Sequence, residues 1–511
     1  MKTRMVNFLS IFVVLLLPQV NLSLSVGDVS FWCNQTPYPQ QCKYHMSYDI
    51  PFVSKKQFLT MAQQTALMVV SSSLRFADSL VSRVQHDGTE KSAWRTCLFF
   101  YSQAAFRLNR SLDSSLGSTA DDVQTWLSAA ASNIRACHGG FFDVNVTSDI
   151  FPLVMLNNVT ELISNCLAVN FGFLRQEGIR REGVIKVLKK DGALMKRADC
   201  VVAQDGSGNF RTIREALQAA GRRTRRISDF VIRVKQGVYS EIVEVRQSNI
   251  VLIGDGVGKT VVTGNRRVAD GFTLYESATF KVSGDGFKAV GMTFENTAGV
   301  AAGQAVAMAS TADRSVFYRC SFKGYQDTLL AQSNRQFYKN CQIYGTVDFI
   351  FGNAAAVFQD CTIHLRKPQP GGGLVVTAQD RNGPHENTGF TIHRGRVMAA
   401  PDLAPFPQIK AFLGRPWGDF SRTVYLRSTL DTLVDPAGWL AWGGAPPRRC
   451  DTLDYGEFEN HGTGASTHRR VKWRGYRVIR DRRTAEAYDV DRLINGKVWL
   501  PGTGVPFDAD F

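Results

Sequence analysis

The spacing of apolar residues divides the chain into two regions of different periodicity. Across residues 54–170 they recur at three- and four-residue intervals, as at Val123, Trp126 and Leu127, which is the period of one face of an α-helix. An all-α bundle of roughly four or five helices is predicted there. After Cys200 the chain changes to short runs rich in β-branched and aromatic residues, separated by Gly and Asn. This texture is typical of strands, so a helical bundle followed by an all-β domain is predicted.

A repeat within the β-rich region indicates its architecture. Three segments align on their cysteines, which follow one another at steps of 21 and 20 residues: Cys320, Cys341 and Cys361. This period fits one coil of a right-handed parallel β-helix, where equivalent positions on neighbouring coils stack about 4.8 Å apart. Helix-containing solenoids have similar periods, but the β-branched and aromatic content disfavours them.

The first residues have the features of an export signal. Lys2 and Arg4 precede an apolar run over residues 8–17, and small residues follow near Gly27. A run of about ten residues is too short to span a bilayer. We therefore expect a cleaved signal peptide over 1–25, with a signal anchor as the alternative, and a secreted protein without a stable membrane span.

Composition sets the other boundaries. We assign the helical bundle to 26–170, a basic linker to 171–199 and the β-helix to 200–511. The linker carries two dibasic pairs, Lys189-Lys190 and Lys196-Arg197. They are candidate sites for a processing protease, although a basic linker can also be plain solvated chain.

The charge of the chain points to an anionic partner. The formal net charge is +15, and an export signal favours an anionic extracellular polymer over nucleic acid. The alternative is that the basic residues only keep the protein soluble. Four N-glycosylation sequons all begin before residue 161, which predicts a glycosylated N-terminal part: Asn34, Asn109, Asn145 and Asn158.

Two aspartates occupy equivalent positions of the repeat. Asp327 is seven residues after Cys320, and Asp348 is seven residues after Cys341. Two carboxyl groups on stacked coils should not both ionise easily, because like charges raise one pKa and leave an acid beside a carboxylate. Such a pair can supply a nucleophile and a general acid. The alternative is that each aspartate caps a turn, but equivalent placement favours the catalytic interpretation.

Further polar and aromatic groups accompany the pair. Gln304 lies 22 residues before Gln326, about one coil away, and neutral amides can donate hydrogen bonds to a developing oxyanion. Arg415 could hold a carboxylate through two nitrogens, and Trp417 offers a face on which a sugar can stack. Each of these residues alone would be weak evidence.

Other chemistries lack their sequence patterns. The chain has no Gly-x-Ser-x-Gly elbow, its eight histidines have no zinc-ligand spacing, and its glycine-rich segments lack a complete phosphate-loop pattern. No metal ion or other cofactor is therefore expected.

Taken together, these segments resemble plant pectin methylesterase (pectinesterase). The motifs are Gly-Gln-Ala-Val at 303–306, Gly-Tyr-Gln-Asp-Thr at 324–328, Gly-Thr-Val-Asp-Phe-Ile-Phe-Gly at 345–352 and Leu-Gly-Arg-Pro-Trp at 413–417. The resemblance runs from about Val201 to the C-terminus. Residues 33–42 and 121–130 are similar to the signatures of the pectin methylesterase inhibitor domain.

This resemblance implies an activity and unequal roles for the aspartates. Asp348 would attack the methyl ester of a galacturonate unit, and Asp327 would act as acid and then base. Gln304 and Gln326 would stabilise the tetrahedral intermediate. The implied substrate is methylesterified homogalacturonan of the plant cell wall, which would give methanol and pectate. The bundle would be autoinhibitory or an aid to folding and export.

The resemblance also implies that Arg415 and Trp417 position Asp348 and the sugar chain. A substrate-contacting threonine of the family aligns with Leu274 here, so Thr273 beside it is taken as the candidate contact. The usual basic-Arg-Leu-Leu processing sequence is absent, and Ile-Lys-Val-Leu-Lys-Lys at 185–190 is the nearest segment.

The resemblance also implies a set of disulfides. It pairs Cys33 with Cys42 and Cys97 with Cys137, leaves Cys166 free, and joins the consecutive coils through Cys341 and Cys361. The pairing of Cys200, Cys320 and Cys450 stays open.

Two other functions remain as alternatives. The β-helix could belong to a lyase or polygalacturonase that cleaves the pectin chain, although the Asn-Thr-Asp pattern with paired aspartates of such hydrolases is missing. A non-catalytic inhibitor or wall-binding protein is the other possibility, based on the bundle.

Overall fold

A computed structural model describes residues 26–46, 52–79, 88–146, 157–180, 198–223, 228–443 and 450–510. The predicted signal peptide at 1–25 and both dibasic pairs lie outside these ranges. Within them, no helix combines the length and the apolar character needed to cross a membrane.

The N-terminal region is the predicted helical bundle. Its helices are α1 (Val29–Cys33), α2 (Pro39–His45), α3 (Lys55–Ser79), α4 (Gly88–Leu112), α5 (Ala120–Asp143) and α7 (Val159–Arg180). A short antiparallel pair, β1 (Val26–Gly27) and β2 (Val53–Ser54), joins its start. Helix α7 continues past residue 170, where we expected the bundle to end. A capping box of Thr119 and Asp122 satisfies the first amides of α5 and fixes its N-terminus.

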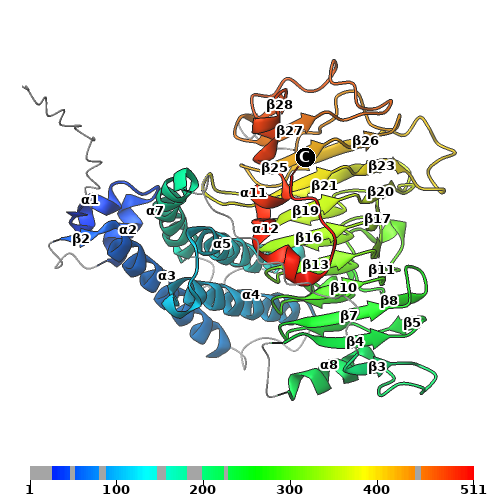
Figure 1. Ribbon diagram of the computed structural model, residues 1–511, viewed down its shortest axis with the longest axis horizontal. Helices are drawn as coiled ribbons and strands as arrows, with labels where there is room; N and C mark the ends of the chain where they lie inside the picture. Colours follow the sequence, from blue (N-terminus) through cyan, green and yellow to red (C-terminus); the bar gives the residue numbers. More distant parts are fainter. Residues whose placement is uncertain are drawn as a thin grey trace, which may run out of the picture.

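Both disulfides expected in the bundle are present. Cys33 is bonded to Cys42 and Cys97 to Cys137, while Cys166 is a buried free thiol. The second bridge joins α4 to α5, the two helices nearest the β domain (Figure 1).

The C-terminal region is a parallel β-helix of three sheets, as predicted. The 11-stranded sheet contains β3 (Cys200–Val202), β4 (Phe230–Val234), β7 (Ile250–Gly254), β10 (Lys288–Val290), β13 (Ser315–Tyr318), β16 (Arg335–Lys339), β19 (Ala355–Gln359), β22 (Gly389–His393), β25 (Arg422–Leu426), β27 (Asp454–Phe458) and β28 (Tyr476–Val478). The 8-stranded sheet contains β5 (Gly237–Ser240), β8 (Thr260–Gly264), β11 (Thr293–Asn296), β14 (Ser321–Lys323), β17 (Gln342–Gly345), β20 (Thr362–Leu365), β23 (Arg396–Ala399) and β26 (Thr429–Leu430). The 7-stranded sheet contains β6 (Val243–Val245), β9 (Phe280–Val282), β12 (Met308–Ser310), β15 (Leu329–Ala331), β18 (Ile350–Gly352), β21 (Val375–Gln379) and β24 (Phe412–Pro416).

Short helices accompany the coils. Helix α8 (Ile213–Gly221) lies at the first coils, α9 (Leu274–Ser277) precedes β9, and α10 (Arg482–Glu486), α11 (Val490–Ile494) and α12 (Gly496–Trp499) follow the last strand (Figure 1).

The predicted repeat sets the register of the coils. Phe317 pairs with Tyr338, and Tyr338 pairs with Phe358. Their rings stack inside the coils, with centroids 4.9 Å and 4.5 Å apart. Each such aromatic pair adds about 0.5–1.5 kcal/mol to the stabilisation from burial, so the repeat that was visible in the sequence is a ladder of core side chains.

The expected bridge between Cys341 and Cys361 is wrong, since both residues are buried free thiols. In a parallel ladder equivalent side chains point the same way, side by side. A disulfide instead needs its two Cβ–Sγ bonds turned toward each other. The Cys341 thiol donates to the carbonyl of Phe317 at 3.3 Å, and the Cys361 thiol donates to that of Tyr338 at 3.4 Å.

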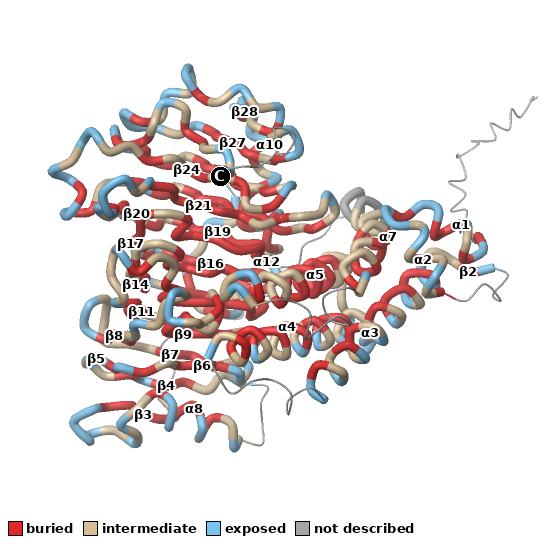
Figure 2. Tube along the Cα trace, turned by 180° about the vertical axis from the view of Figure 1, so that it is seen from behind, coloured by how far each residue is buried: buried red, intermediate tan, exposed pale blue. Residues whose placement is uncertain are grey.

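The bundle packs against one side of the β-helix (Figures 1 and 2). Val306, Leu330 and Phe351 belong to the same buried apolar cluster as the bundle core. Leu330 and Phe351 are paired on neighbouring strands β15 and β18. The outer face of the 7-stranded sheet is therefore covered by helices.

Candidate active site

The two candidate aspartates lie in equivalent turns that lead into the 7-stranded sheet. Asp327 stands two residues before β15 and Asp348 two residues before β18, and the two strands pair Leu329 with Ile350. Both aspartates have left-handed φ angles, 60° and 51°, a conformation that Asp tolerates better than most residues. The register thus places the two carboxyl groups on adjacent coils.

The two glutamines stack beside the acid pair. Gln304 and Gln326 form a parallel bridge, and both line the cavity that contains the aspartates. Their side chains come from consecutive coils, as predicted from their spacing. Two neutral amides therefore face the space where an oxyanion would form.

Arg415 on β24 holds one of the two aspartates. Its Nε donates to Asp348 Oδ1 at 2.9 Å and its Nη2 donates to Oδ2 at 2.6 Å. The Arg415 guanidinium lies 4.3 Å from the ring centroid of Trp442. A charge-assisted pair of this geometry fixes the Asp348 carboxylate and favours its ionised form.

Burial and charge separate the two carboxyl groups. Burial, then the neighbouring charges of Asp348 and Asp143, hold the pKa of Asp327 well above its usual value. Burial also raises the pKa of Asp348, but the hydrogen bonds and charge of Arg415 oppose that rise. The arrangement favours a protonated Asp327 beside an ionised Asp348.

The surrounding cavity has a volume of about 210 Å³ and is lined by both domains: Asp143, Leu274, Gln304, Gln326, Asp327, Asp348, Phe351, Ala378, Arg415, Trp417 and Trp442. Trp417 lies 5.9 Å from Phe351, centroid to centroid. The predicted aromatic position at Trp417 is thus at the cavity wall.

Thr273 does not line this cavity. Its side chain caps α9 and contacts Thr96 of helix α4 at 2.6 Å, and its backbone amide donates to Ser92. The neighbouring Leu274 takes the place at the cavity wall. A cap residue must point its hydroxyl back at the helix amides, and this turns Thr273 away from the aspartates.

Two residues at the cavity, Asp143 and Trp442, were not predicted from the sequence. Asp143 is the last residue of α5 and accepts a hydrogen bond from the Leu274 amide at 2.9 Å. Burial raises the pKa of Asp143 to about 6. Its place at the site depends on how the bundle docks, which no local sequence pattern encodes.

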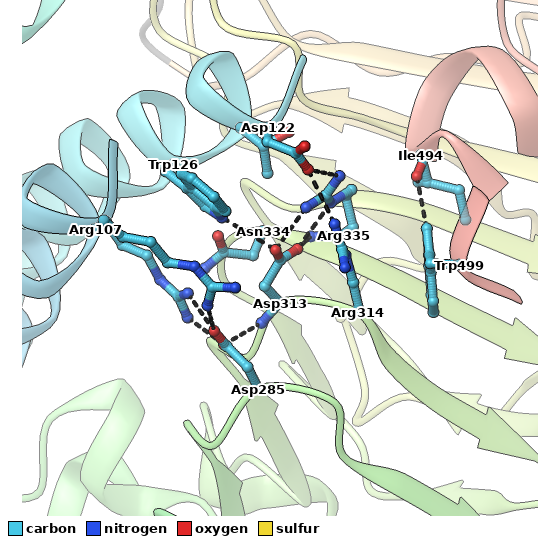
Figure 3. A network of polar contacts seen from close by, with 12 residues as sticks. Arg107, Asp122, Trp126, Asp285, Asp313, Arg314, Asn334, Arg335, Ile494 and Trp499 are labelled. Atoms are coloured by element: carbon cyan, nitrogen blue, oxygen red, sulfur yellow. Dashed lines mark hydrogen bonds and ion pairs between the residues drawn. The ribbon is translucent and has the colours of Figure 1, made fainter. Parts of the chain in front are cut away.

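A buried ionic network fixes the bundle beside the site (Figure 3). Arg107 of α4, fully buried, donates to both oxygens of Asp285 at 2.7 Å and 2.6 Å. Arg335 of β16 donates to Asp313 at 2.7 Å and to Asp122 of α5 at 2.8 Å. Charged groups from both domains thus neutralise one another in the interface.

In the described part of the chain, no cluster of three or more His, Cys, Asp or Glu side chains is arranged to hold a metal ion.

Comparison with known proteins identifies both regions. Residues 199–497 match the family model described as Pectinesterase, and residues 28–169 match the one described as plant invertase/pectin methylesterase inhibitor. A probable pectinesterase/pectinesterase inhibitor of Arabidopsis thaliana is 45% identical over 491 residues, covering 94% of each chain. Pectinesterase 2 of Citrus sinensis is 44% identical, covering 96% of this chain and 97% of that one.

Solved structures agree with this assignment. The pectin methylesterase from carrot is 46% identical, has a TM-score of 0.60 and covers 62% of this chain and 98% of its own. The pectin methylesterase from Aspergillus niger is 29% identical, has a TM-score of 0.52 and covers 60% of this chain and 95% of its own. The chain therefore belongs to the pectinesterase family and carries an inhibitor-family domain as its N-terminal bundle.

Proposed function

We propose that this protein hydrolyses the galacturonate methyl esters of cell-wall pectin, with Asp348 as the nucleophile and Asp327 as the acid and base. The observation that carries this proposal is the unequal pair of stacked carboxyl groups, one held by Arg415 and one buried beside negative charge. The names of the relatives and the export signal support pectin in the wall as the substrate.

The first half-reaction forms an acyl-enzyme. The ionised Asp348 attacks the ester carbonyl carbon, and the side-chain amides of Gln304 and Gln326 donate hydrogen bonds to the developing oxyanion. The tetrahedral intermediate collapses by breaking the bond to the methoxy oxygen. Asp327 gives its proton to that oxygen, so methanol leaves as a neutral molecule.

The second half-reaction regenerates the enzyme. Asp327, now a carboxylate, takes a proton from water, and the resulting hydroxide attacks the acyl carbon. Asp348 departs as a carboxylate that Arg415 again holds through two nitrogens. The released product is a free galacturonic acid unit, which ionises in water.

The test is methanol release from methylated pectin by the full-length chain and by Asp348→Ala. We expect the variant to lose at least a thousandfold in kcat, since it lacks the nucleophile. Glu486→Gln, which removes an exposed carboxylate of α10 paired with Arg482 on the same helix, is the matched control and should retain activity. Normal methanol release by Asp348→Ala, or loss of pectin viscosity without methanol, would contradict the proposal.

The bundle is proposed to be autoinhibitory. It places Asp143 in the cavity and covers the outer face of the 7-stranded sheet, so a polymer cannot reach the aspartates while the bundle is docked. A protease site inserted into residues 181–197 would allow the intact chain to be cut after purification. We expect cutting and dilution to raise activity at least tenfold, and an unchanged rate after complete separation would contradict this role.

A further inference from the structure

The 8-stranded sheet faces away from the bundle. Figures 1 and 2 show its strands at the opposite side of the β-helix from α3, α4 and α5. The polar contacts of the bundle go instead to other parts of the β-helix, such as Asp285, Asp313 and Glu386. The outer face of this sheet therefore stays accessible when the bundle covers the aspartates.

A basic and aromatic ladder runs across this open face. Lys323 of β14 pairs with Tyr344 of β17, which pairs with His364 of β20. The Tyr344 and His364 rings are stacked, with centroids 4.3 Å apart and planes 9° apart. Lys323 Nζ lies 5.7 Å from the Tyr344 centroid. A cation thus stands between two parallel rings and Glu295 of β11, which pairs with Lys323 on its other side.

A second cation completes the face. Met398 of β23 pairs with His364, and Arg396, two residues earlier on the same strand, points to the same side. Arg396 is exposed. Burial lowers the pKa of His364, so its ring is neutral at pH 7 and acts as an aromatic surface. We call Lys323, Tyr344, His364 and Arg396 the basic ladder.

This combination matches the chemistry of an acidic polysaccharide. The stacked Tyr344 and His364 rings form an apolar strip on the surface, and Lys and Arg pair with carboxylates. The net charge of +15 favours the approach of any polyanion, and the stacked rings add an apolar surface beside the two cations. De-esterified galacturonan has one carboxylate on every sugar and fits both features.

Arg366, two residues after His364 of the basic ladder, contacts the segment that carries Asp327. Arg366, just past β20, donates to the Tyr325 hydroxyl at 2.6 Å and to the Gly324 carbonyl at 3.1 Å. Its guanidinium lies 3.7 Å from the Tyr325 ring centroid. Tyr325 directly precedes Gln326 and Asp327. A polymer on this face is therefore one corner of the β-helix away from the cavity.

We propose that the basic ladder is a second binding site for de-esterified galacturonan, separate from the cavity of the aspartates and open while the bundle is docked. The identity of the ligand rests on the proposed function, because this polymer is the acidic product of that reaction. The site would hold the covered, inactive chain on pectin that has already been demethylated.

The test measures equilibrium binding of the full-length chain to immobilised polygalacturonate, which carries no methyl esters and cannot turn over. Lys323→Gln with Arg396→Gln should weaken binding about tenfold, the effect of losing two exposed ionic contacts. Tyr344→Ala should weaken it about threefold through the lost ring. The matched control, Arg214→Gln with Arg233→Gln, removes two exposed charges from α8 and β4 and should stay within about twofold of the parent chain.

Three outcomes would overturn the proposal: unchanged binding by the ladder variant, an equal loss in the control variant, or an equal loss of binding to heparin, which would show a general polyanion surface. Methanol release from methylated pectin is measured in parallel. Binding without methanol would remove the proposed reaction and leave the ladder as a galacturonan site. Methanol release without ladder-dependent binding would leave the reaction and remove this site.

Discussion

Asp327 and Asp348 occupy nearly identical turns, yet their surroundings differ. Both have left-handed φ angles and both precede paired strands by two residues. Asp348 is held by the guanidinium of Arg415, whereas Asp327 faces the charges of Asp348 and Asp143. The repeat of the fold thus supplies two equal carboxyl groups, and Arg415 on a later coil and Asp143 of the bundle make them unequal. The chemistry depends on that inequality more than on the turns.

The strongest challenge to this comparison is to remove each carboxylate in turn. Asp348→Asn and Asp327→Asn should each lower kcat on methylated pectin by about 10³–10⁴. An ester with a more acidic alcohol needs no proton from Asp327, so it should restore much of the rate of Asp327→Asn and none of that of Asp348→Asn. Equal restoration in both variants, measured by single-turnover kinetics, would show that the roles are not divided.

Substitution of Arg415, which makes the two carboxyl groups unequal, should have the next largest effect on activity. Arg415→Gln should reduce kcat about 10²–10³-fold, because the pKa of Asp348 rises when the guanidinium no longer favours its carboxylate. The acidic limb of the pH–rate profile should move to higher pH. Arg415→Lys keeps the charge without the two-nitrogen contact, so a profile as displaced as that of Arg415→Gln would argue that geometry rather than charge sets the pKa.

The bundle can be loosened without touching either aspartate. Arg107→Ala leaves Asp285 with Arg110 and the Asp313 amide as partners, so it should cost less than the roughly 3–5 kcal/mol of leaving a buried charge uncompensated. We expect activity of the full-length chain to rise roughly tenfold, with the acidic limb of its pH–rate profile unchanged. Arg246→Ala, an exposed arginine paired with Glu244 on the same strand, is the control. A shift of the acidic limb in Arg107→Ala would show that the contact between Arg107 and Asp285 also affects the two catalytic aspartates.

The smallest effect is expected from Asp143→Asn. Because the docked pKa of Asp143 is raised to about 6, docking is fully favoured below the ordinary Asp value and loses this contribution as the pH rises through about 6. The activity of the intact chain should therefore increase above pH 6, and this increase should be a few-fold larger than that of the cleaved chain. The variant should lack that rise and stay covered. If Asp143→Asn showed the same increase in activity above pH 6, a group other than Asp143 would be responsible for the increase.

The features that were predictable were those written into the repeat. The steps of 21 and 20 residues placed Asp327 and Asp348 on adjacent coils, and the 22-residue step did the same for Gln304 and Gln326. Parallel pairing converts such spacing directly into position.

The remaining features depend on contacts between distant segments. Asp143 reaches the cavity only because α5 docks there, and Trp442 reaches Arg415 from a loop outside the repeat. We expected Thr273 to contact the substrate. As the N-cap of α9, it turns its hydroxyl toward the helix amides, and the next residue, Leu274, lines the cavity instead. The bridge between Cys341 and Cys361, which the family resemblance implied, was wrong because matching motifs carry no information on the direction of the Cβ–Sγ bonds.

The two domains should respond differently to redox reagents, because the bundle contains disulfides and the β-helix contains buried free thiols. Both disulfides lie in the bundle, while Cys320, Cys341 and Cys361 are buried thiols and burial raises the pKa of Cys341. A mild reductant would therefore destabilise the helical bundle and leave the β-helix unchanged. Alkylating reagents would reach Cys320, Cys341 and Cys361 only after the coils open, so the labelling rate of these three thiols would measure unfolding of the β-helix.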